Sequence, residues 1–289
     1  MRFVVIVAMA ACAGAPVATG GAGGGALSFG FMHATGDKSA AEGAERLSKD
    51  LTQALGSPVS AKVFGSPREL AEALATGKID AAWMSPGAYV LAAKQGEVEP
   101  ILKLSRMGFG RYRSIFFSKA GAPFDSLQAA KGKTLALVAG ASMSGHLFPL
   151  AFLKRKGIDP ATHFGKVIEG KDHEEVCRMV LSGQADLGVT LGDYRAPDEL
   201  TPDGCAMAGM DAEQFAVLDA VGPIPNDVVA VRASLNGSLK EKLRDALSDL
   251  HRTEAGREEL KIIFKADGFV PANDTDFAAV RDLQQFMDE

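Results

Sequence analysis

The sequence predicts an α/β fold built as two lobes. Segments typical of strands and of amphipathic helices alternate along the chain, and the alternation starts again after Arg111. A strand, a helix and a second strand in succession are typical of a parallel sheet covered by helices. The 289 residues suffice for two domains of ordinary size, and their apolar share of 47% supports a large core. Because the chain passes between the two units more than once, we expect a cleft between them.

The first unit is expected to begin with three strand–helix pairs. Its strands are residues 27–32, 59–64 and 79–83, which are short apolar runs. Apolar residues at spacings of three and four predict the first helix, which ends at Gly56. A capping box at 66–69, with proline at the first helical position, begins the second helix, which stops at Gly77. Pro86 begins the third helix directly after Ser85.

The second unit is expected to repeat this order. Its strands are residues 113–118, 134–138, 165–168 and 185–190, and its helices are residues 146–156 and 174–181. A return strand at 227–232 leads to the C-terminal helices, which begin near Leu239. Ligands of such sheets bind at the carboxyl ends of strands, where the connections diverge. Three loops fall at such ends: residues 32–39, 84–89 and 140–145.

The loop after the strand at 134–138 is suited to hold an anion. Ser142, Ser144 and Gly145 stand where the next helix should begin. The first turn of a helix leaves backbone N–H groups unpaired, and the helix dipole makes that end electropositive. Two hydroxyls beside those amides can form an oxyanion cradle. In the alternative interpretation, Ser142 or Ser144 is only a helix N-cap.

Charge and motifs argue against several functional classes. The net charge is −5 with no block of like charges, which argues against a nucleic-acid partner. The sequence has no P-loop, no CxxC or HExxH pair, and five scattered histidines, so neither a metal nor another cofactor is expected. Ser144 is followed by Gly145 and His146, but the GxSxG signature of a hydrolase is absent. We therefore expect no enzymatic activity.

The N-terminus predicts export from the cytoplasm. Arg2 precedes an apolar run at 3–11, which is too short to cross a membrane and is typical of an export signal. Cys12 is either the lipidated residue of a loose lipobox or part of an A-x-A cleavage site. Residues 13–26 then form a flexible Gly/Ala linker. Both routes place the mature protein in the periplasm, either soluble or tethered to a membrane through Cys12.

The two other cysteines, Cys177 and Cys205, have two interpretations. An oxidising compartment permits a disulfide between them. Cys177 also lies within an apolar helical pattern, so it is otherwise a buried free thiol. The sequence leaves both interpretations open.

Six segments in a fixed order resemble one protein family. They are IDAAWMSPGAYVLA at 79–92, YRSIFFSK at 112–119, SLQAAKGKTLALV at 126–138, SMSGHLFPLAFLKRKGIDP at 142–160, GPIPNDVVAVR at 222–232 and DGFVPANDTDF at 267–277. In order and rough spacing they resemble the periplasmic solute-binding proteins of ABC importers of the phosphonate/phosphite type. The resemblance spans nearly the whole mature chain.

The resemblance implies a type II periplasmic-binding-protein fold, in which two lobes joined by crossing strands close on a ligand. We assign residues 27–110 and 222–289 to lobe 1 and residues 111–221 to lobe 2. The family's proteins deliver a small molecule to a membrane permease of an ABC transporter and catalyse no reaction. We also expect the protein to be monomeric.

The resemblance carries ligand contacts to positions of this chain. Tyr89 matches a ligand-facing tyrosine, and His173 matches a histidine that donates to the bound anion. Ser142, Ser144 and Gly145 match the family's oxyanion loop. Asp227 and, less closely, Asp193 match acids that hold an amino group on some ligands. With their loop neighbours, the expected ligand-binding residues are Tyr89, Ser142, Met143, Ser144, Gly145, His173, Asp193, Asp227, Ser85, His33 and Thr35.

Three departures from the family pattern bear on the ligand. Met143 replaces a threonine at the centre of the oxyanion loop, Asp172 replaces a serine before the histidine, and residues 32–35 (MHAT) replace a usual Pro-Tyr. A thioether donates no hydrogen bond and adapts to apolar surface. Met32, Met84 and Met143 therefore predict an alternative ligand class, a larger apolar molecule such as a lipid or a sterol. A sensory module that signals by closure is a third interpretation.

Overall fold

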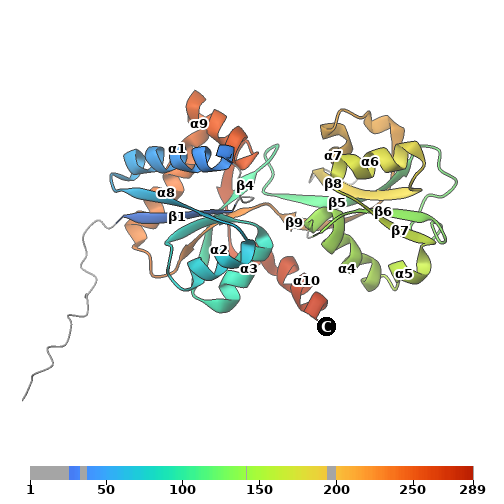
Figure 1. The fold of residues 1–289 in the computed structure, drawn as a ribbon, viewed down its shortest axis with the longest axis horizontal. Helices are drawn as coiled ribbons and strands as arrows, with labels where there is room; N and C mark the ends of the chain where they lie inside the picture. The colour runs from blue at the N-terminus through green and yellow to red at the C-terminus, as the bar shows by residue number, and fades with distance from the viewer. Residues whose placement is uncertain (1–25, 33–37, 141, 194–199, 289) are drawn as a thin grey trace, which may run out of the picture.

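The structure is a computed structural model, and it describes residues 26–32, 38–140, 142–193 and 200–288. Two α/β lobes lie side by side, and the chain crosses between them (Figure 1). The predicted α/β fold of two lobes is therefore confirmed. Cys12, His33 and Thr35 lie outside the described residues, as does the expected export signal. In the described part of the chain, no helix is both long enough and apolar enough to span a bilayer.

The first lobe is built on a six-stranded mixed sheet. In spatial order its strands are β11 (Gly268–Pro271), β4 (Val98–Ser105), β10 (Val228–Arg232), β3 (Ala81–Met84), β1 (Leu27–Met32) and β2 (Val59–Phe64). β1 pairs in parallel with β2 and β3, whereas β10 is antiparallel to β3 and β4. The expectation of a parallel sheet holds for β1 to β3 only, because the return strand enters the middle of the sheet in the opposite direction.

Helices cover both faces of this first sheet. They are α1 (Lys38–Leu55), α2 (Pro67–Ala75), α3 (Pro86–Gln95), α8 (Gly237–Asp249), α9 (Glu254–Glu259) and α10 (Ala278–Asp288), with shorter turns η4 (Leu250–Arg252), η5 (Leu260–Phe264) and η6 (Asp274–Phe277). Successive side chains of β10 point to opposite faces of the sheet and pack into two different cores. Val229 and Val231 pack with α1 and α8, whereas Val228 and Ala230 pack with α2 and α3.

The second lobe is built on a five-stranded mixed sheet. In spatial order its strands are β7 (Lys166–Gly170), β6 (Thr134–Val138), β8 (Leu187–Asp193), β5 (Arg111–Lys119) and β9 (Phe215–Pro225). Its helices are α4 (Phe148–Arg155), α5 (Pro160–His163), α6 (His173–Ser182) and α7 (Asp203–Met207), with turns η1 (Met143–Leu147) and η3 (Ala212–Gln214). α6 and α7 pack on one face and α4 on the other.

Two short segments carry the chain between the lobes, at 106–110 and at 226–227. Pro225 still pairs with Arg111 in the second sheet, and Val228 pairs with Met84 in the first. Residues 222–225 therefore belong to the second sheet. The sequence places the return to lobe 1 at residue 222, whereas the chain crosses at 226–227.

The sequence predicts none of β4, β9 and β11. β4 contains Pro100, β9 ends in Gly222-Pro223 and Pro225, and β11 has only four residues. Proline lacks a backbone donor and is normally confined to sheet edges or bulges. Pro100 lies inside the sheet because the pairing of β4 with β10 shifts register beside it. These segments therefore resemble loops until their pairing partners are known.

The two lobes also share an apolar contact, which we call the interlobe cluster. Phe148 and Ala151 of α4 pack with Val280 and Leu283 of α10, and Tyr89 and Phe277 complete the cluster. α10 contacts both α3 and α4. Figure 1 shows it below the crossing strands, between the two lobes.

Candidate functional site

A cavity of about 870 Å³ opens between the lobes. The second lobe contributes Tyr112, Ser142, Ser144, His173, Leu191, Asp193, Asp203, Ala206 and Met207, the crossings contribute Arg106, Met107, Asn226 and Asp227, and the first lobe contributes Lys261, Lys265, Ala266 and Asp267. Arg111 lies in the lining at the start of β5. The cavity is thus bounded by the second sheet, by both crossings and by residues 261–267 of the first lobe. A molecule held in it would touch both lobes.

One end of the cavity is rich in hydrogen-bond donors. Ser142 is the N-cap of the π-helical turn η1, and its Oγ accepts from the N–H of Gly145 over 3.1 Å. The amides of Met143 and Ser144 open this turn, before the first hydrogen bonds within the helix can form. Because η1 continues into α4, this end also carries the positive end of the helix dipole. The start of the helix is therefore suited to hold an anion, as the sequence predicts.

Tyr112 adds a phenol to this end. It lies at the start of β5, opposite Asp193 of β8, and its side chain is hydrogen-bonded to that of Ser144. Burial raises the pKa of Tyr112 well above its ordinary value, and the carboxylate of Asp227 adds to the shift. The hydroxyl therefore stays protonated and can donate. Ser144 is almost fully buried, with 3% of its surface exposed.

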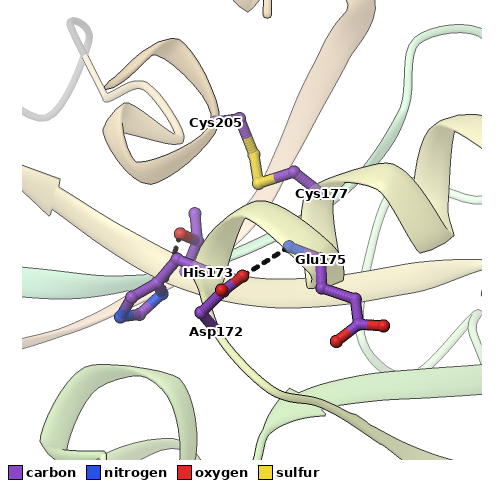
Figure 2. The surroundings of a disulfide bond; sticks show 6 residues. Asp172, His173, Glu175, Cys177 and Cys205 are labelled. Carbon is purple, nitrogen blue, oxygen red and sulfur yellow. Dashed lines mark hydrogen bonds between the residues drawn. A yellow bond between two sulfur atoms is a disulfide. The ribbon is translucent and has the colours of Figure 1, made fainter. Parts of the chain in front are cut away.

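His173 begins α6 and lines the same cavity. Its Nδ1 lies 3.0 Å from the hydroxyl of Thr190 on β8. Asp172, the N-cap of α6, accepts from the N–H of Glu175 over 2.9 Å (Figure 2). Burial lowers the pKa of His173 below its ordinary value of 6.5, although the charge of Asp172 opposes the shift. His173 is therefore uncharged at neutral pH.

An ion pair lies in the same lining, near Tyr112. Arg106 Nη2 lies 3.3 Å from Asp227 Oδ2, and Arg106 Nη1 donates to Asn226 Oδ1 over 3.0 Å. Arg106 Nε donates to the carbonyl of Lys265 over 3.0 Å. Burial raises the pKa of Asp227, and Arg106 opposes that shift. The two crossings are thus tied together by a charge pair that borders the cavity.

Five of the expected ligand-binding residues line the cavity: Ser142, Ser144, His173, Asp193 and Asp227. Gly145 lies just behind them, because a Cβ at its position would meet the side chain of Val138 at 2.4 Å. Ser85 is not in the lining, and its hydroxyl caps α3 by accepting from the N–H of Ala88. His33 and Thr35 lie outside the described residues.

Tyr89 lies elsewhere, so the expected ligand contact is corrected. Its ring is fully buried in the interlobe cluster against Phe277, with ring centroids 4.6 Å apart. Its hydroxyl donates to Asp274 Oδ1 over 2.7 Å. Tyr89 is therefore a core residue with a satisfied hydroxyl, and Tyr112 takes the position at the cavity.

Of the methionines named in the sequence, Met84 and Met143 are not part of the cavity lining. Met84 is buried in the core of the first lobe, and Met143 packs against the interlobe cluster. The side chain of Met32 lies outside the described part of the structure. Met107 and Met207 line the cavity instead and are exposed. Met84 and Met143 therefore give no support to an apolar ligand.

Sequence reasoning missed Tyr112 and Arg106. Arg106 lies in the first crossing, and Tyr112 lies in β5, one residue after the point where the strand–helix cycle restarts. That restart marks where the chain enters the second lobe beside the cleft, so it was a usable signal. Arg106 stands in no recognisable motif, whereas Tyr112 begins the family-like segment at 112–119.

His146, two residues after Ser144, has its ring nitrogen directed at other groups. The Nδ1 of His146 lies 2.8 Å from the carbonyl oxygen of Val138 and 3.7 Å from Glu169 Oε1. The imidazole is thus directed at the end of β6. Within the residues that the structure describes, no group of three or more His, Cys, Asp or Glu could hold a metal ion.

Cys177 of α6 and Cys205 of α7 are joined by a disulfide (Figure 2). Of the two interpretations that the sequence leaves open, the structure shows the bridge. It ties together the two helices that carry His173 and Met207 to the cavity.

Comparison with protein families gives one match that spans most of the chain. Residues 29–277 match the model described as "ABC transporter, phosphonate, periplasmic substrate-binding protein". The matched range contains the donor-rich end of the cavity, both crossings and both sheets.

Comparison with solved structures supports the same architecture. XAC2383 from Xanthomonas citri, solved with chloride ion and with ATP, is 22% identical, with a TM-score of 0.67 for the chloride structure over 91% of this chain and 99% of that one. PhnD1 from Prochlorococcus marinus, solved with methylphosphonate, is 16% identical, with a TM-score of 0.64 over 91% and 98%. A binding protein of an ABC phosphonate transporter from Pseudomonas aeruginosa is 21% identical, with a TM-score of 0.60 over 90% and 86%. At these identities the likeness establishes the fold, which is the predicted type II binding-protein fold.

Proposed function

The chain belongs to the phosphonate family of periplasmic substrate-binding proteins of ABC transporters, and we propose that it binds a phosphonate- or phosphite-like oxyanion in the cavity between its lobes. Its family places it outside the cytoplasm, with a small molecule as ligand and an ABC permease as partner. The observation that carries the proposal is that four polar side chains, Ser142, Ser144, Tyr112 and His173, line the same cavity, into which the start of η1 also opens.

The electrostatics of that end favour a tetrahedral anion. Hydroxyl and amide donors at a helix start stabilise an oxyanion through charge-assisted hydrogen bonds. Arg106, paired with Asp227, supplies a full positive charge in the same lining. Asp193 and Asp227 in the same lining are suited to a ligand that carries an amino group at its other end.

Four further features are part of the proposal. The mature protein is monomeric, and its N-terminal export signal is removed in the periplasm. Cys12 tethers it to a membrane if the lipobox route is used. It carries out no chemistry on its ligand, because Ser144 faces hydrogen-bond partners rather than a base.

Calorimetric titration with phosphite, methylphosphonate and phosphate tests the proposed ligand class. We expect at least one oxyanion to bind, and Ser144→Ala to weaken that binding about tenfold through the loss of one donor. Ser85→Ala is the matched control, because Ser85 is also an N-cap serine but lies outside the cavity lining. The proposal is wrong if no oxyanion binds at millimolar concentration. Co-purified molecules identified by mass spectrometry would then name the ligand class.

A further inference from the structure

The imidazole of His173 is hydrogen-bonded to a buried hydroxyl. Thr190 lies on β8 with none of its surface exposed, and its Oγ1 lies 3.0 Å from His173 Nδ1. Because Nδ1 is occupied, Nε2 is the nitrogen left for the cavity.

The hydroxyl of Thr190 determines which nitrogen carries the proton. Within the described residues, Nδ1 of His173 is the hydrogen-bond partner of that hydroxyl. If the hydroxyl only accepted a hydrogen bond from Nδ1–H, its own hydrogen would be buried without an acceptor, which is costly. The hydroxyl is therefore the donor and Nδ1 the acceptor. A neutral imidazole that accepts at Nδ1 carries its proton on Nε2.

The backbone of α7 closes over this contact. A Cβ placed on Gly204 would lie 2.1 Å from Thr190 Oγ1 and 3.4 Å from His173 Cβ. No side chain fits there, and no water fits between Gly204 and the hydroxyl. The neighbouring Cys205 is bonded to Cys177, one turn after His173 on α6 (Figure 2). The disulfide thus holds α7 where its backbone leaves no room for another hydrogen-bond partner of Thr190.

From this geometry we propose that Thr190 is a positioning residue that fixes His173 as a neutral imidazole donating its Nε2–H into the cavity. The proposal rests on the proposed function, since it assumes that an oxyanion accepts the hydrogen bond from Nε2–H. A donor of fixed tautomer is ready for an acceptor oxygen before the ligand arrives, whereas the other tautomer would present a lone pair to the anion and repel it.

The charged neighbours of His173 do not override this arrangement. Asp172, on the same helix, favours the charged imidazole, but burial has the larger effect and lowers the pKa. Asp203 on α7 is occupied, because it accepts from the N–H of Asp193 over 2.5 Å and from the hydroxyl of Thr201 over 2.6 Å. On β8 Asp193 lines the same cavity, and on β5 Tyr112 stays protonated. The ring is therefore neutral above pH 7.

Long-range ¹H–¹⁵N spectra of the imidazoles test the proposal in the protein without ligand. At pH 7.5 we expect His173 to show a protonated Nε2 and an unprotonated Nδ1. The His173→Gln variant assigns its signals among the five histidines. A protonated Nδ1, or a doubly protonated ring, overturns the proposal. Because no ligand is present, this result is independent of whether an oxyanion binds.

Two variants of Thr190 separate positioning from packing. Thr190→Val keeps the shape of the side chain and removes the hydroxyl, so we expect a mixture of tautomers and roughly tenfold weaker binding of methylphosphonate, or of whichever tested oxyanion binds. Thr190→Ser keeps the hydroxyl, so we expect the wild-type tautomer and affinity within about threefold. Wild-type affinity in the valine variant, or equal losses in both variants with the tautomer unchanged, overturns the proposal. Absence of oxyanion binding with the predicted tautomer contradicts the proposed function alone.

Discussion

Arg106 and Asp227 form an ion pair that joins the two crossing segments, with Nη2 and Oδ2 3.3 Å apart. The pair borders the cavity and is half-exposed to it, with 36% and 31% of the two side chains accessible. Each residue therefore has two possible partners, the other residue or the ligand. An anion competes with Asp227 for Arg106, and an ammonium group competes with Arg106 for Asp227.

Asp227→Asn is expected to separate two kinds of ligand. The substitution removes a negative charge and leaves Arg106 available, so an oxyanion without an amino group should bind roughly fivefold more tightly. An aminophosphonate should instead lose affinity. Parallel calorimetric titrations with methylphosphonate and 2-aminoethylphosphonate measure both effects. Asp219→Asn is the control, because Asp219 pairs with Lys156 outside the cavity lining. If both ligands change in the same direction, Asp227 does not discriminate between them.

Removing single tyrosine hydroxyls is expected to affect two different properties. Tyr89→Phe breaks the hydrogen bond to Asp274, so the free energy of unfolding should fall by about 1 kcal/mol while ligand affinity is unchanged. Tyr112→Phe removes a donor at the cavity, so affinity should fall about tenfold. Urea denaturation and calorimetry on both variants give the comparison. A loss of ligand affinity in the Tyr89 variant would show that Tyr89 contacts the ligand after all.

Loss of the disulfide is expected to lower stability substantially. Cys177 and Cys205 are 28 residues apart in the sequence, and the bridge restricts the unfolded chain. For a loop of this length the loss amounts to about 3–4 kcal/mol in the chain-entropy description. Urea denaturation of the double variant Cys177→Ser/Cys205→Ser, compared with the oxidised wild type, measures it. Equal midpoints and slopes would show that the bridge does not contribute to stability.

Stability should fall as the pH rises from about 4.5 to about 7 because of Glu259. Burial raises the pKa of Glu259 to about 7, and the neighbouring carboxylate of Asp50 adds to the shift. Between the ordinary value of 4.5 and about 7, the folded protein holds a proton that the unfolded chain has lost, so the free energy of unfolding decreases over that window.

Glu259→Gln is expected to remove this dependence. Thermal unfolding is measured at pH 5, 6, 7 and 8. The unfolding temperature of the variant should rise relative to that of the wild type as the pH rises, with the largest difference at pH 8. Glu258→Gln serves as the control at an exposed neighbouring position. A gain that does not change with pH would mean that Glu259 titrates normally.

Local signals in the sequence predicted the elements that position the anion site. The strand at 134–138, followed by small residues and Ser142, indicated a helix start without knowledge of any distant contact. Such signals depend on neighbouring residues only. They could not give the direction of β10, since an apolar run buried on both faces has the same composition in parallel and antiparallel pairings.

The error at Tyr89 has a physical cause of the same kind. Its partner Asp274 is 185 residues away in the sequence, so no local pattern shows that the hydroxyl is already used. Met143 was misplaced for a related reason. At the first residue of η1, its side chain packs toward α4 and the interlobe cluster, and the turn of the helix rather than the residue type decides which side faces the cavity.

The two lobes differ in when they can assemble, because β10 lies in the middle of the first sheet. The second sheet uses the continuous stretch 111–225, so its strands are all present once that stretch has been made. β3 and β4 each lack the neighbour that separates them until residues 228–232 arrive and pair with both. Exposed strand edges of this kind pair readily with other chains. A nascent or truncated chain that ends before β10 should therefore aggregate through its first lobe while its second lobe is already folded.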